Sequence, residues 1–495
     1  MRFLYRTIAA GFTLLVISAG GPLSVHASTL EQRILAASEK LEQGDCRGSL
    51  KYWDAVLRDK AFPNLTESAR DATYNLAVYC ALRTNQDDRA YRYALGGTRQ
   101  SIGTEFLWRV RFSTELDQLR DVQAVETAEA MAMHNPAALN EMPVRRLFQL
   151  EYRVSSDPQM HARLLRVVAA PSYRPYDVFG ASDGFRRKYA VMLADAGDIA
   201  GALELVRSIE DPPNLLKAST DSRLRAALPP EFDGRAQVER SLAKFSDFAA
   251  NHPESLAVVV RVAQHQRMLG LMEEALATLE AARPDQPGKT AFVDQDEYIK
   301  WWWDEMARSY QWLGRYDDAV AALRAGMLID EYGRSNVSQT LNLSLAQYRF
   351  GRPDDALATI SDIEKRLNEV SAYGRMVMHL VRGCSRMATG QAAAAQADLS
   401  YAVAHELDHQ EALTTLQLCA GDLDGAAATL IRRLDDPGRR AEALLELSDF
   451  DPPPATYPTT AADLRFAQVS VRKDVQAAIA RAGLVHRFRL QKTGF

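Results

Sequence analysis

One five-residue stretch of the sequence has the residue types of a catalytic metal site. Residues 405–409 read His-Glu-Leu-Asp-His, which fits the pattern H-E-x-x-H. When this pattern lies within one helix, both histidines face the same side and bind zinc, while the glutamate activates a water molecule. Glu411, Glu442 and Glu446 follow as possible third ligands. A zinc metallopeptidase acting through His405, Glu406 and His409 is therefore one hypothesis.

The helical register around this stretch argues against zinc. Counted from Gly390 and Ala395, His405 falls at the end of a helix and His409 falls in the turn that follows. A helix break between the two histidines would turn them to different faces. We therefore expect no metal, no cofactor and no catalytic residue here, and we keep His405 and His409 only as alternative metal ligands.

A second string has the residues of a nucleophile elbow. Residues 180–184 read Gly-Ala-Ser-Asp-Gly, which fits G-x-S-x-G. That elbow requires a strand before the serine and a helix after it, within a parallel sheet. The sequence does not alternate strands and helices anywhere else. We therefore interpret the string as a glycine- and serine-containing loop and do not predict a hydrolase.

Four cysteines form two pairs with similar spacing. Cys46 and Cys80 are separated by nearly the same number of residues as Cys384 and Cys419. In an oxidising compartment, each pair could form a disulfide. The alternative is four buried thiols, because cysteine also packs well as a small apolar residue. The sequence does not decide between these interpretations, since it does not give the Cα separations.

The composition indicates a globular protein with a substantial core. The chain has 495 residues, of which 47% are hydrophobic and 25% are charged, and its formal net charge is −5. A chain of this length is typical of several domains. Because nucleic-acid binding usually requires a basic surface, we expect no nucleic-acid partner.

The first residues have the features of a bacterial export signal. Arg2 and Arg6 precede the short apolar run at 8–18, and Ala27 supplies the small residue that signal peptidase requires. The apolar run is shorter than the roughly 20 residues that span a bilayer. We therefore predict a signal peptide over 1–27, cleaved after Ala27, and a periplasmic or otherwise exported protein that does not span the membrane.

The elements that must position any site are helical. Within residues 297–330, Met306, Ala307, Tyr310 and Leu313 recur at helical spacing. Gly314 then ends the helix, since glycine readily adopts the left-handed conformation found at helix ends. Asp317 and Asp318 begin the next helix, where carboxylates favour the positive end of the helix dipole. These residues predict two helices joined by a tight turn.

This stretch resembles the tetratricopeptide repeat (TPR) family, whose unit is a helical hairpin of about 34 residues. Residues of the expected aromatic, small or aliphatic type stand at Trp303, Ala307, Tyr310, Gly314, Tyr316, Ala319, Leu323 and Gly326. The resemblance implies an all-α, TPR-like solenoid of stacked helix-turn-helix repeats. It also implies that Trp303 packs in the core.

A glycine, an alanine five residues later and an aliphatic residue four further on recur along the chain. The pattern appears at Gly197, Ala202 and Val206; Gly270, Ala275 and Leu279; Gly314, Ala319 and Leu323; Gly351, Ala356 and Ile360; Gly390, Ala395 and Leu399; and Gly421, Ala426 and Leu430. Nearer the start, Asn85 takes the place of the glycine. Six copies of one spacing indicate a repeat architecture.

Breaks in this pattern suggest domain boundaries. We predict degenerate TPR-like repeats over 28–230, a regular solenoid over 231–437, and a C-terminal helix and tail over 438–495 that follow a proline-rich break at 452–454. Residues 471–490, VRKDVQAAIARAGLVHRFRL, resemble the C-terminal segment of the bacteriophage adsorption protein A family. That resemblance points to the cell envelope and to exopolysaccharide systems.

The expected function is binding without catalysis, because stacked repeats present an extended concave surface. The TPR resemblance implies that this surface receives a protein or peptide. The candidate groove residues are Trp301, Asp304, Arg308, Trp312, Tyr348 and Arg349. Trp301 and Trp312 would expose apolar area unless a ligand, the neighbouring repeat or the 284–296 connection covered them. The alternative function is assistance to exopolysaccharide synthesis or export, with an envelope polysaccharide or its export machinery as partner.

Overall fold

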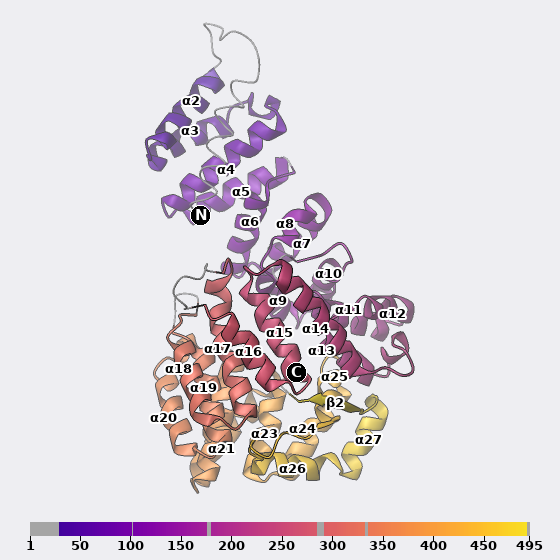
Figure 1. Ribbon diagram of the computed structural model, residues 1–495. Coiled ribbons are helices and arrows are strands. Elements are labelled where there is room, and N and C mark those ends of the chain that lie inside the picture. Colours follow the sequence, from indigo (N-terminus) through magenta and orange to yellow (C-terminus); the bar gives the residue numbers. More distant parts are fainter. Residues whose placement is uncertain (1–28, 101, 176–179, 285–291, 332–334, 493–495) are drawn as a thin grey trace. The chain divides into compact units, whose positions relative to one another are not determined.

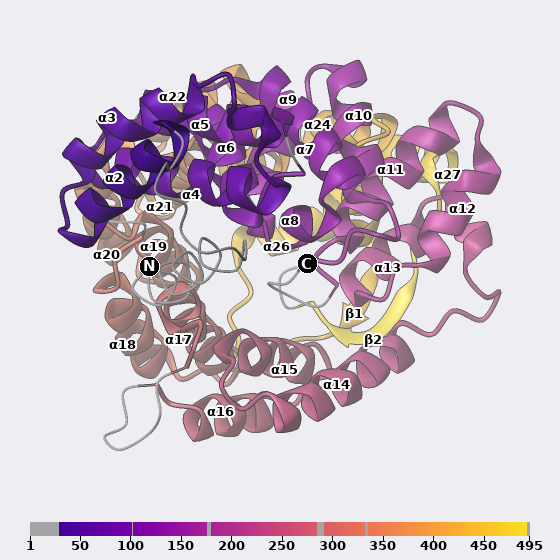
Figure 2. The same ribbon diagram turned by 90° about the horizontal axis from the view of Figure 1, so that it is seen from above.

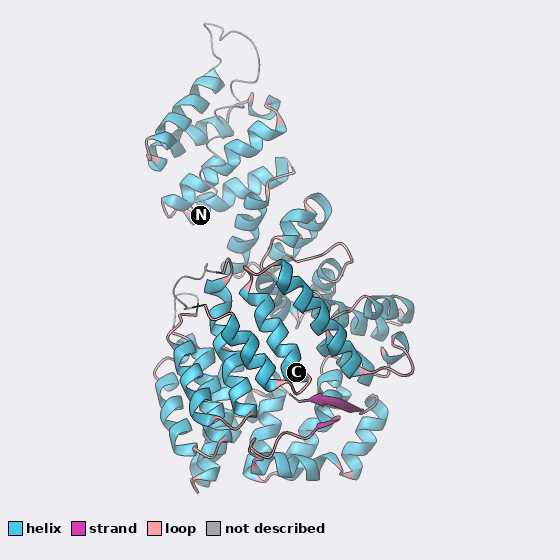
Figure 3. Cartoon of the chain, viewed as in Figure 1, coloured by secondary structure: helices cyan, strands magenta, loops and turns pink. Residues whose placement is uncertain are grey.

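The structure is a computed structural model. It describes residues 29–492 except 101, 176–179, 285–291 and 332–334. The predicted signal peptide over 1–27 lies outside the described residues. Helices make up nearly all of the regular structure, and within the described residues the strands are confined to one short pair (Figure 3). None of the helices in these ranges combines the length and the apolar character needed to cross a membrane.

The chain divides into two compact units, residues 1–189 and 190–495, and the division falls within helix α11 (Figure 1). The helices up to the division are α2 (Thr29–Glu42), α3 (Cys46–Leu57), η1 (Phe62–Asn64), α4 (Glu67–Arg83), α5 (Asp87–Gln100), α6 (Glu105–Asp117), α7 (Asp121–His134), α8 (Pro136–Asn140), α9 (Val144–Val154), α10 (Pro158–Val168) and α11 (Asp183–Asp195). From α2 to α7 each helix packs against its neighbours in sequence, whereas α10 packs chiefly against α7.

Unit 2 contains the regular repeats. Its helices are α12 (Ile199–Arg207), α13 (Pro212–Thr220), η2 (Arg225–Ala227), α14 (Gly234–Asn251), α15 (Leu256–Met268), α16 (Met272–Ala281), α17 (Gln295–Trp312), α18 (Tyr316–Met327), α19 (Val337–Arg349), α20 (Pro353–Glu364), η3 (Leu367–Glu369), α21 (Ala372–Ala388), α22 (Ala392–Ala404), η4 (Glu406–Asp408), α23 (Gln410–Ala420), α24 (Leu423–Asp435), α25 (Arg440–Leu447), α26 (Ala461–Ser470) and α27 (Lys473–Ala482). Successive helices pair as hairpins, and each hairpin packs on the next.

The repeated glycine–alanine pattern explains these hairpins. The six glycines all have positive φ, and Asn85 adopts the same left-handed conformation with φ of 56°. The six alanines five residues later are completely buried, where their small side chains allow the two helices of a hairpin to approach closely. The predicted all-α, TPR-like solenoid is confirmed.

Unit 2 differs from the predicted division of the chain. The boundary expected at 230/231 lies inside this unit, where α13 packs against α14. The proline-rich break also does not end the packed structure: α26 packs on α23, and α27 packs on α24. The tail expected over 438–495 is therefore part of the same unit, because its apolar residues complete a core begun by the preceding repeats.

Two short strands connect the end of unit 2 to its beginning. Strand β1 (Asp449–Asp451) pairs in parallel with β2 (Arg487–Gln491), so that Phe450 lies opposite Phe488. Strand β2 lies against α14 and α15 (Figure 2). Helix α13 packs against α25. Phe488 and Leu490 are buried with Leu216, Val238 and Met268. Unit 2 thereby closes on itself.

Candidate functional site

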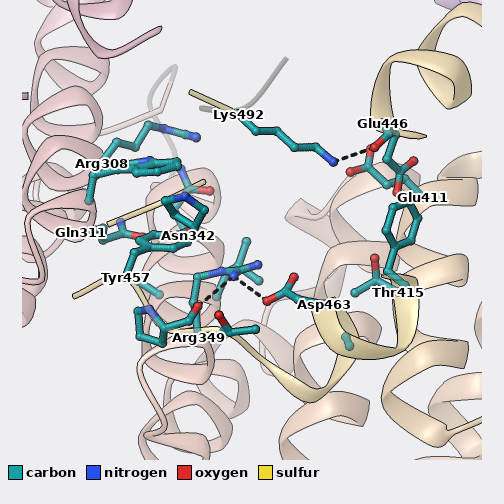
Figure 4. A pocket seen from close by; sticks show the side chains of 18 of the residues that line it. Arg308, Gln311, Asn342, Arg349, Glu411, Thr415, Glu446, Tyr457, Asp463 and Lys492 are labelled. Atoms are coloured by element: carbon teal, nitrogen blue, oxygen red, sulfur yellow. Dashed lines mark hydrogen bonds and ion pairs between the residues drawn. The ribbon is translucent and has the colours of Figure 1, made fainter. Parts of the chain in front are cut away.

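Unit 2 encloses a cavity of about 690 Å³. One wall is formed by α17 and α19, and the opposite wall by α23 and α25 (Figure 4). The proline-rich segment, defined here as residues 452–459, and the start of α26 line the cavity between these walls. Polar, charged and aromatic side chains from both walls therefore reach a common space.

On the first wall, α17 presents three functional side chains at intervals of four residues. Asp304, Arg308 and Trp312 consequently lie on one face of this helix and line the cavity. Arg308 Nε donates a 2.6 Å hydrogen bond to Asp304, and Asn342 of α19 donates to the other oxygen of the same carboxylate at 2.8 Å. The charge of Asp304 raises the pKa of Arg308 above its ordinary value. This network fixes the position of the guanidinium group.

The proline-rich segment lies against this wall beside Trp312 and Arg349. The ring of Tyr457 stacks on Trp312, with ring centroids 4.7 Å apart and planes inclined by 12°. The Arg349 guanidinium lies 5.2 Å from the centroid of the Tyr457 ring, and Arg349 Nη1 also donates to Asp463 at 3.1 Å. Burial raises the pKa of the Tyr457 hydroxyl. Tyr457 is thus held as a neutral aromatic side chain between a tryptophan and an arginine.

The opposite wall carries carboxylates. Glu411 and Thr415 of α23 point toward the cavity, together with Glu446 of α25 (Figure 4). Arg433 forms a 2.7 Å ion pair with Glu446, and Lys492 donates to the backbone carbonyl of Glu446 at 2.9 Å. Burial among protein atoms and the negative charge of nearby Glu446 raise the pKa of Glu411. This wall therefore suits a positively charged or hydrogen-bond-donating group.

Four of the six predicted groove residues line the cavity together: Asp304, Arg308, Trp312 and Arg349. The other two are not among its lining residues. Trp301 is 37% exposed elsewhere on α17, and the Tyr348 hydroxyl lies 3.3 Å from Cys419 Sγ against two core clusters. Trp301 and Tyr348 therefore lie outside the site that the other four form.

Sequence reasoning did not predict Gln311, Asn342, Thr415, Tyr457 and Lys492 as site residues, and it considered Glu411, Glu442 and Glu446 only as possible zinc ligands. Asn342 and Arg349 are seven residues apart on α19, so helical periodicity carried a signal for that wall. Periodicity carried no corresponding signal for Tyr457 and Lys492, since both belong to the tail beyond the regular repeats. Trp312 is 6% exposed, and the ring of Tyr457 stacks on it.

The core tryptophan of α17 is Trp302, and the expectation for Trp303 was wrong in register by one residue. Trp302 is fully buried and donates from Nε1 to the backbone carbonyl of Leu279 at 3.0 Å. Trp303 is only partly buried, with its ring packed edge-on against Trp302 and beneath Arg283. One residue corresponds to about 100° around a helix, which separates a core position from a flanking one.

The H-E-x-x-H stretch is interrupted as the register predicted. Helix α22 ends at Ala404, residues Glu406–Asp408 form a short 3-10 turn, and α23 begins after His409. The ring of His405 stacks on Tyr401, whereas that of His409 stacks on Tyr373. Across the described residues, no group of three metal-ligating side chains is placed to hold a metal ion. The two histidines therefore serve separate packing contacts.

In the G-x-S-x-G string, residues 180–182 form a turn that leads into α11. Ser182 is buried and immediately precedes α11. Residues 176–179, where a preceding strand would lie, are outside the described ranges. The string contributes no residue to the cavity.

The two cysteine pairs lie in different units and in different states. Cys384 and Cys419 form a disulfide with Cα atoms 5.2 Å apart, which joins α21 to α23. Cys46 and Cys80 are buried free thiols whose Sγ atoms are 2.7 Å apart. Burial and the neighbouring Cys46 raise the pKa of the Cys80 thiol. Both pairs bring together residues from adjacent hairpins.

Comparison with known proteins identifies no family and no curated relative: no family model matches the chain, and no curated protein matches it. Among solved structures, one similar chain comes from the APC/C hetero-tetramer Cut9–Hcn1, with 12% identity, a TM-score of 0.31, and coverage of 96% of this chain and 98% of that one. Another is the P58(IPK) TPR domain, with 13% identity, a TM-score of 0.21, and coverage of 80% of this chain and 99% of that domain. Neither similarity assigns a function to this chain.

Proposed function

We propose that this chain is a non-catalytic scaffold, exported into the bacterial cell envelope, that holds a segment of a partner polypeptide in the cavity of unit 2. The observation that carries the proposal is the seating of a short polypeptide segment against α17 and α19, with a turn in which the Tyr457 N–H donates to the Pro454 carbonyl at 2.8 Å. Pro458 presents its backbone carbonyl to Arg349 at 3.5 Å, and Tyr457 fills the space beside Trp312. This surface thus already accommodates a peptide backbone and a large side chain.

The part of the cavity beside this segment has groups suited to more polypeptide. Gln311 and Asn342 on one wall and Thr415 on the other offer amide and hydroxyl groups that pair with backbone N–H and C=O groups. Glu411 and Glu446 complement a lysine, an arginine or an amino terminus. The cavity volume lies within the range of about 300–1,000 Å³ that is typical of ligand pockets.

The exported location is supported by the chemistry of two pairs of cysteines. Disulfides persist in oxidising compartments and are rare in the cytosol. The Cys384–Cys419 disulfide therefore agrees with the predicted signal peptide over 1–27. The closeness of the Cys46 and Cys80 sulfur atoms agrees with it as well.

Site-specific photocrosslinking tests the proposal. A photoreactive amino acid would replace Thr415 inside the cavity or, as a matched control, Leu328, which is 87% exposed. The protein would be expressed with its signal and irradiated in intact cells. We expect position 415 to capture a polypeptide that position 328 does not, with crosslinks mapping to one continuous segment.

Two outcomes would contradict the proposal. Equal capture at both positions would show that the cavity is not the binding site. Capture of a carbohydrate polymer at 415 would replace the polypeptide with an envelope polysaccharide and support the exopolysaccharide function. The variants Arg308→Ala and Asn342→Ala should reduce genuine capture at 415, since both residues line the opposite wall.

A further inference from the structure

The proline-rich segment covers the most apolar part of the cavity wall. Trp312 is only 6% exposed, and Tyr457 stacks on it. The ring of Phe350 lies edge-on to that of Tyr457 at a centroid distance of 6.3 Å. Thr456 lies directly over the turn at Gly314, where an added Cβ would come within 2.6 Å of the Thr456 side chain. The segment therefore occupies the position that a bound peptide would need in order to reach Trp312.

Regular secondary structure fixes both ends of the segment, whereas few contacts hold the residues between them. Upstream it is fixed by strand β1, and downstream Thr460 and Asp463 form a capping box at the start of α26. Between these points residues 452–456 are exposed. The contacts with the wall come from Thr456, Tyr457 and Pro458, and Tyr457 supplies the large apolar side chain among them. Tyr457 therefore anchors the middle of the segment on the wall.

We propose that residues 452–459 are a tethered internal ligand that competes with the partner, and that the partner binds through a segment in which an aromatic residue is followed by proline. The inference rests on the proposed function and specifies its ligand. Prolines restrict the backbone, which lowers the conformational entropy that a segment loses on binding. A tether of this length keeps the internal ligand at an effective concentration on the order of millimolar, so a partner must displace it.

A peptide supplied in solution tests this competition. The probe is a fluorescein-labelled peptide with the sequence of residues 451–460, DPPPATYPTT, and binding is followed by fluorescence anisotropy. Tyr457→Ala should remove the internal anchor and expose Trp312. We expect this variant to bind the peptide at least about tenfold more tightly than wild type, since an intramolecular competitor is removed. A peptide with its tyrosine replaced by alanine should not bind.

Matched variants exclude simpler explanations. Tyr152→Ala removes an exposed tyrosine in unit 1 and should leave peptide affinity at the wild-type level. Trp312→Ala added to Tyr457→Ala should abolish the gain. If Tyr457→Ala does not fold, Tyr457→Leu preserves apolar bulk without the stack and should give a smaller gain in affinity.

The proposal is overturned if folded Tyr457→Ala or Tyr457→Leu protein binds the peptide no better than wild type, because the segment is then only a structural link. It is also overturned if the tyrosine-free peptide binds equally well. Neither result would affect crosslinking at position 415, so failure of this inference is distinguishable from failure of the proposed function.

Discussion

The backbone N–H of Leu484 donates a 2.8 Å hydrogen bond to the carbonyl oxygen of Thr220. The two residues lie near opposite ends of unit 2 in sequence. Ser222 donates to the carbonyl of Ala482 at 3.1 Å beside this contact, and the His486 ring lies 2.9 Å from the carbonyl of Ser219. In an open solenoid, each repeat contacts only its neighbours. The closing contact therefore predicts that unit 2 unfolds as one cooperative unit.

Leu490→Ala tests the importance of this closure. Leu490 is fully buried against helices from the start of unit 2, so its truncation should lower the free energy of unfolding by about 2–5 kcal/mol. Urea denaturation monitored by circular dichroism measures the change. Leu464→Ala, at a position that is 60% exposed, is the control and should change stability by less than about 0.5 kcal/mol. Equal effects would mean that the tail contributes little to the fold.

The three consecutive tryptophans should differ sharply in their contribution to stability. Trp302→Ala creates a cavity and leaves the Leu279 carbonyl without its indole donor, so we expect a loss of about 3–5 kcal/mol. Trp301→Ala removes a partly exposed side chain and should cost much less. Thermal denaturation of both variants in parallel provides the comparison. A larger loss at Trp301 would contradict the register described for α17.

The Cys384–Cys419 disulfide should stabilise unit 2. Because it closes a loop of 35 residues, its removal in a Cys384→Ser/Cys419→Ser variant should lower the free energy of unfolding by about 2–4 kcal/mol. Denaturation with and without a reducing agent measures the same contribution in wild type. Reductant should not lower the stability of the double variant through this disulfide. A wild-type protein whose stability does not change on reduction would contradict the prediction.

Cys46 and Cys80 should form a second disulfide when the protein is produced in an oxidising compartment, because their sulfur atoms are already in contact. Titration of free thiols in the unfolded, unreduced protein should detect none, and a Cys46→Ser variant should reveal one. Peptide mapping by mass spectrometry identifies the linked pair. Two free thiols in wild-type protein purified from the periplasm would show that this pair remains reduced.

Acidification should destabilise the protein partly through His409. Burial lowers the pKa of His409 to about 4, and nearby Arg433 acts in the same direction. Between about pH 6.5, the ordinary value, and about pH 4, the unfolded state binds this proton more readily than the folded state, so stability falls as the pH decreases. His409→Phe preserves a ring beside Tyr373 but cannot be protonated. Its urea midpoint should therefore decline less than that of wild type over this range.

An identical decline in both proteins would assign the acid sensitivity to other groups. His405→Phe is the control for this comparison. It also replaces a histidine stacked on a tyrosine, but at an exposed position. Its urea midpoint at neutral pH measures the effect of exchanging a stacked imidazole for phenylalanine, separately from acidification.

The sequence by itself determined the repeat architecture, because the relevant information is local. A glycine that ends one helix and an alanine five residues into the next specify a tight turn and a close crossing, whatever lies elsewhere in the chain. The same local register predicted the helix break between His405 and His409. It also placed Asp304, Arg308 and Trp312 on one face of α17.

Only the tertiary structure decided what faces that helix. The meeting of Tyr457 with Trp312, and of Leu484 with Thr220, depends on small rotations accumulated over many stacked hairpins. Local periodicity does not specify the total rotation between distant hairpins. Residues far apart in sequence therefore could not be assigned to one cavity in advance. The choice of Trp302 over Trp303 for the core was decided in the same way, by the packing of α17 against α15 and α16.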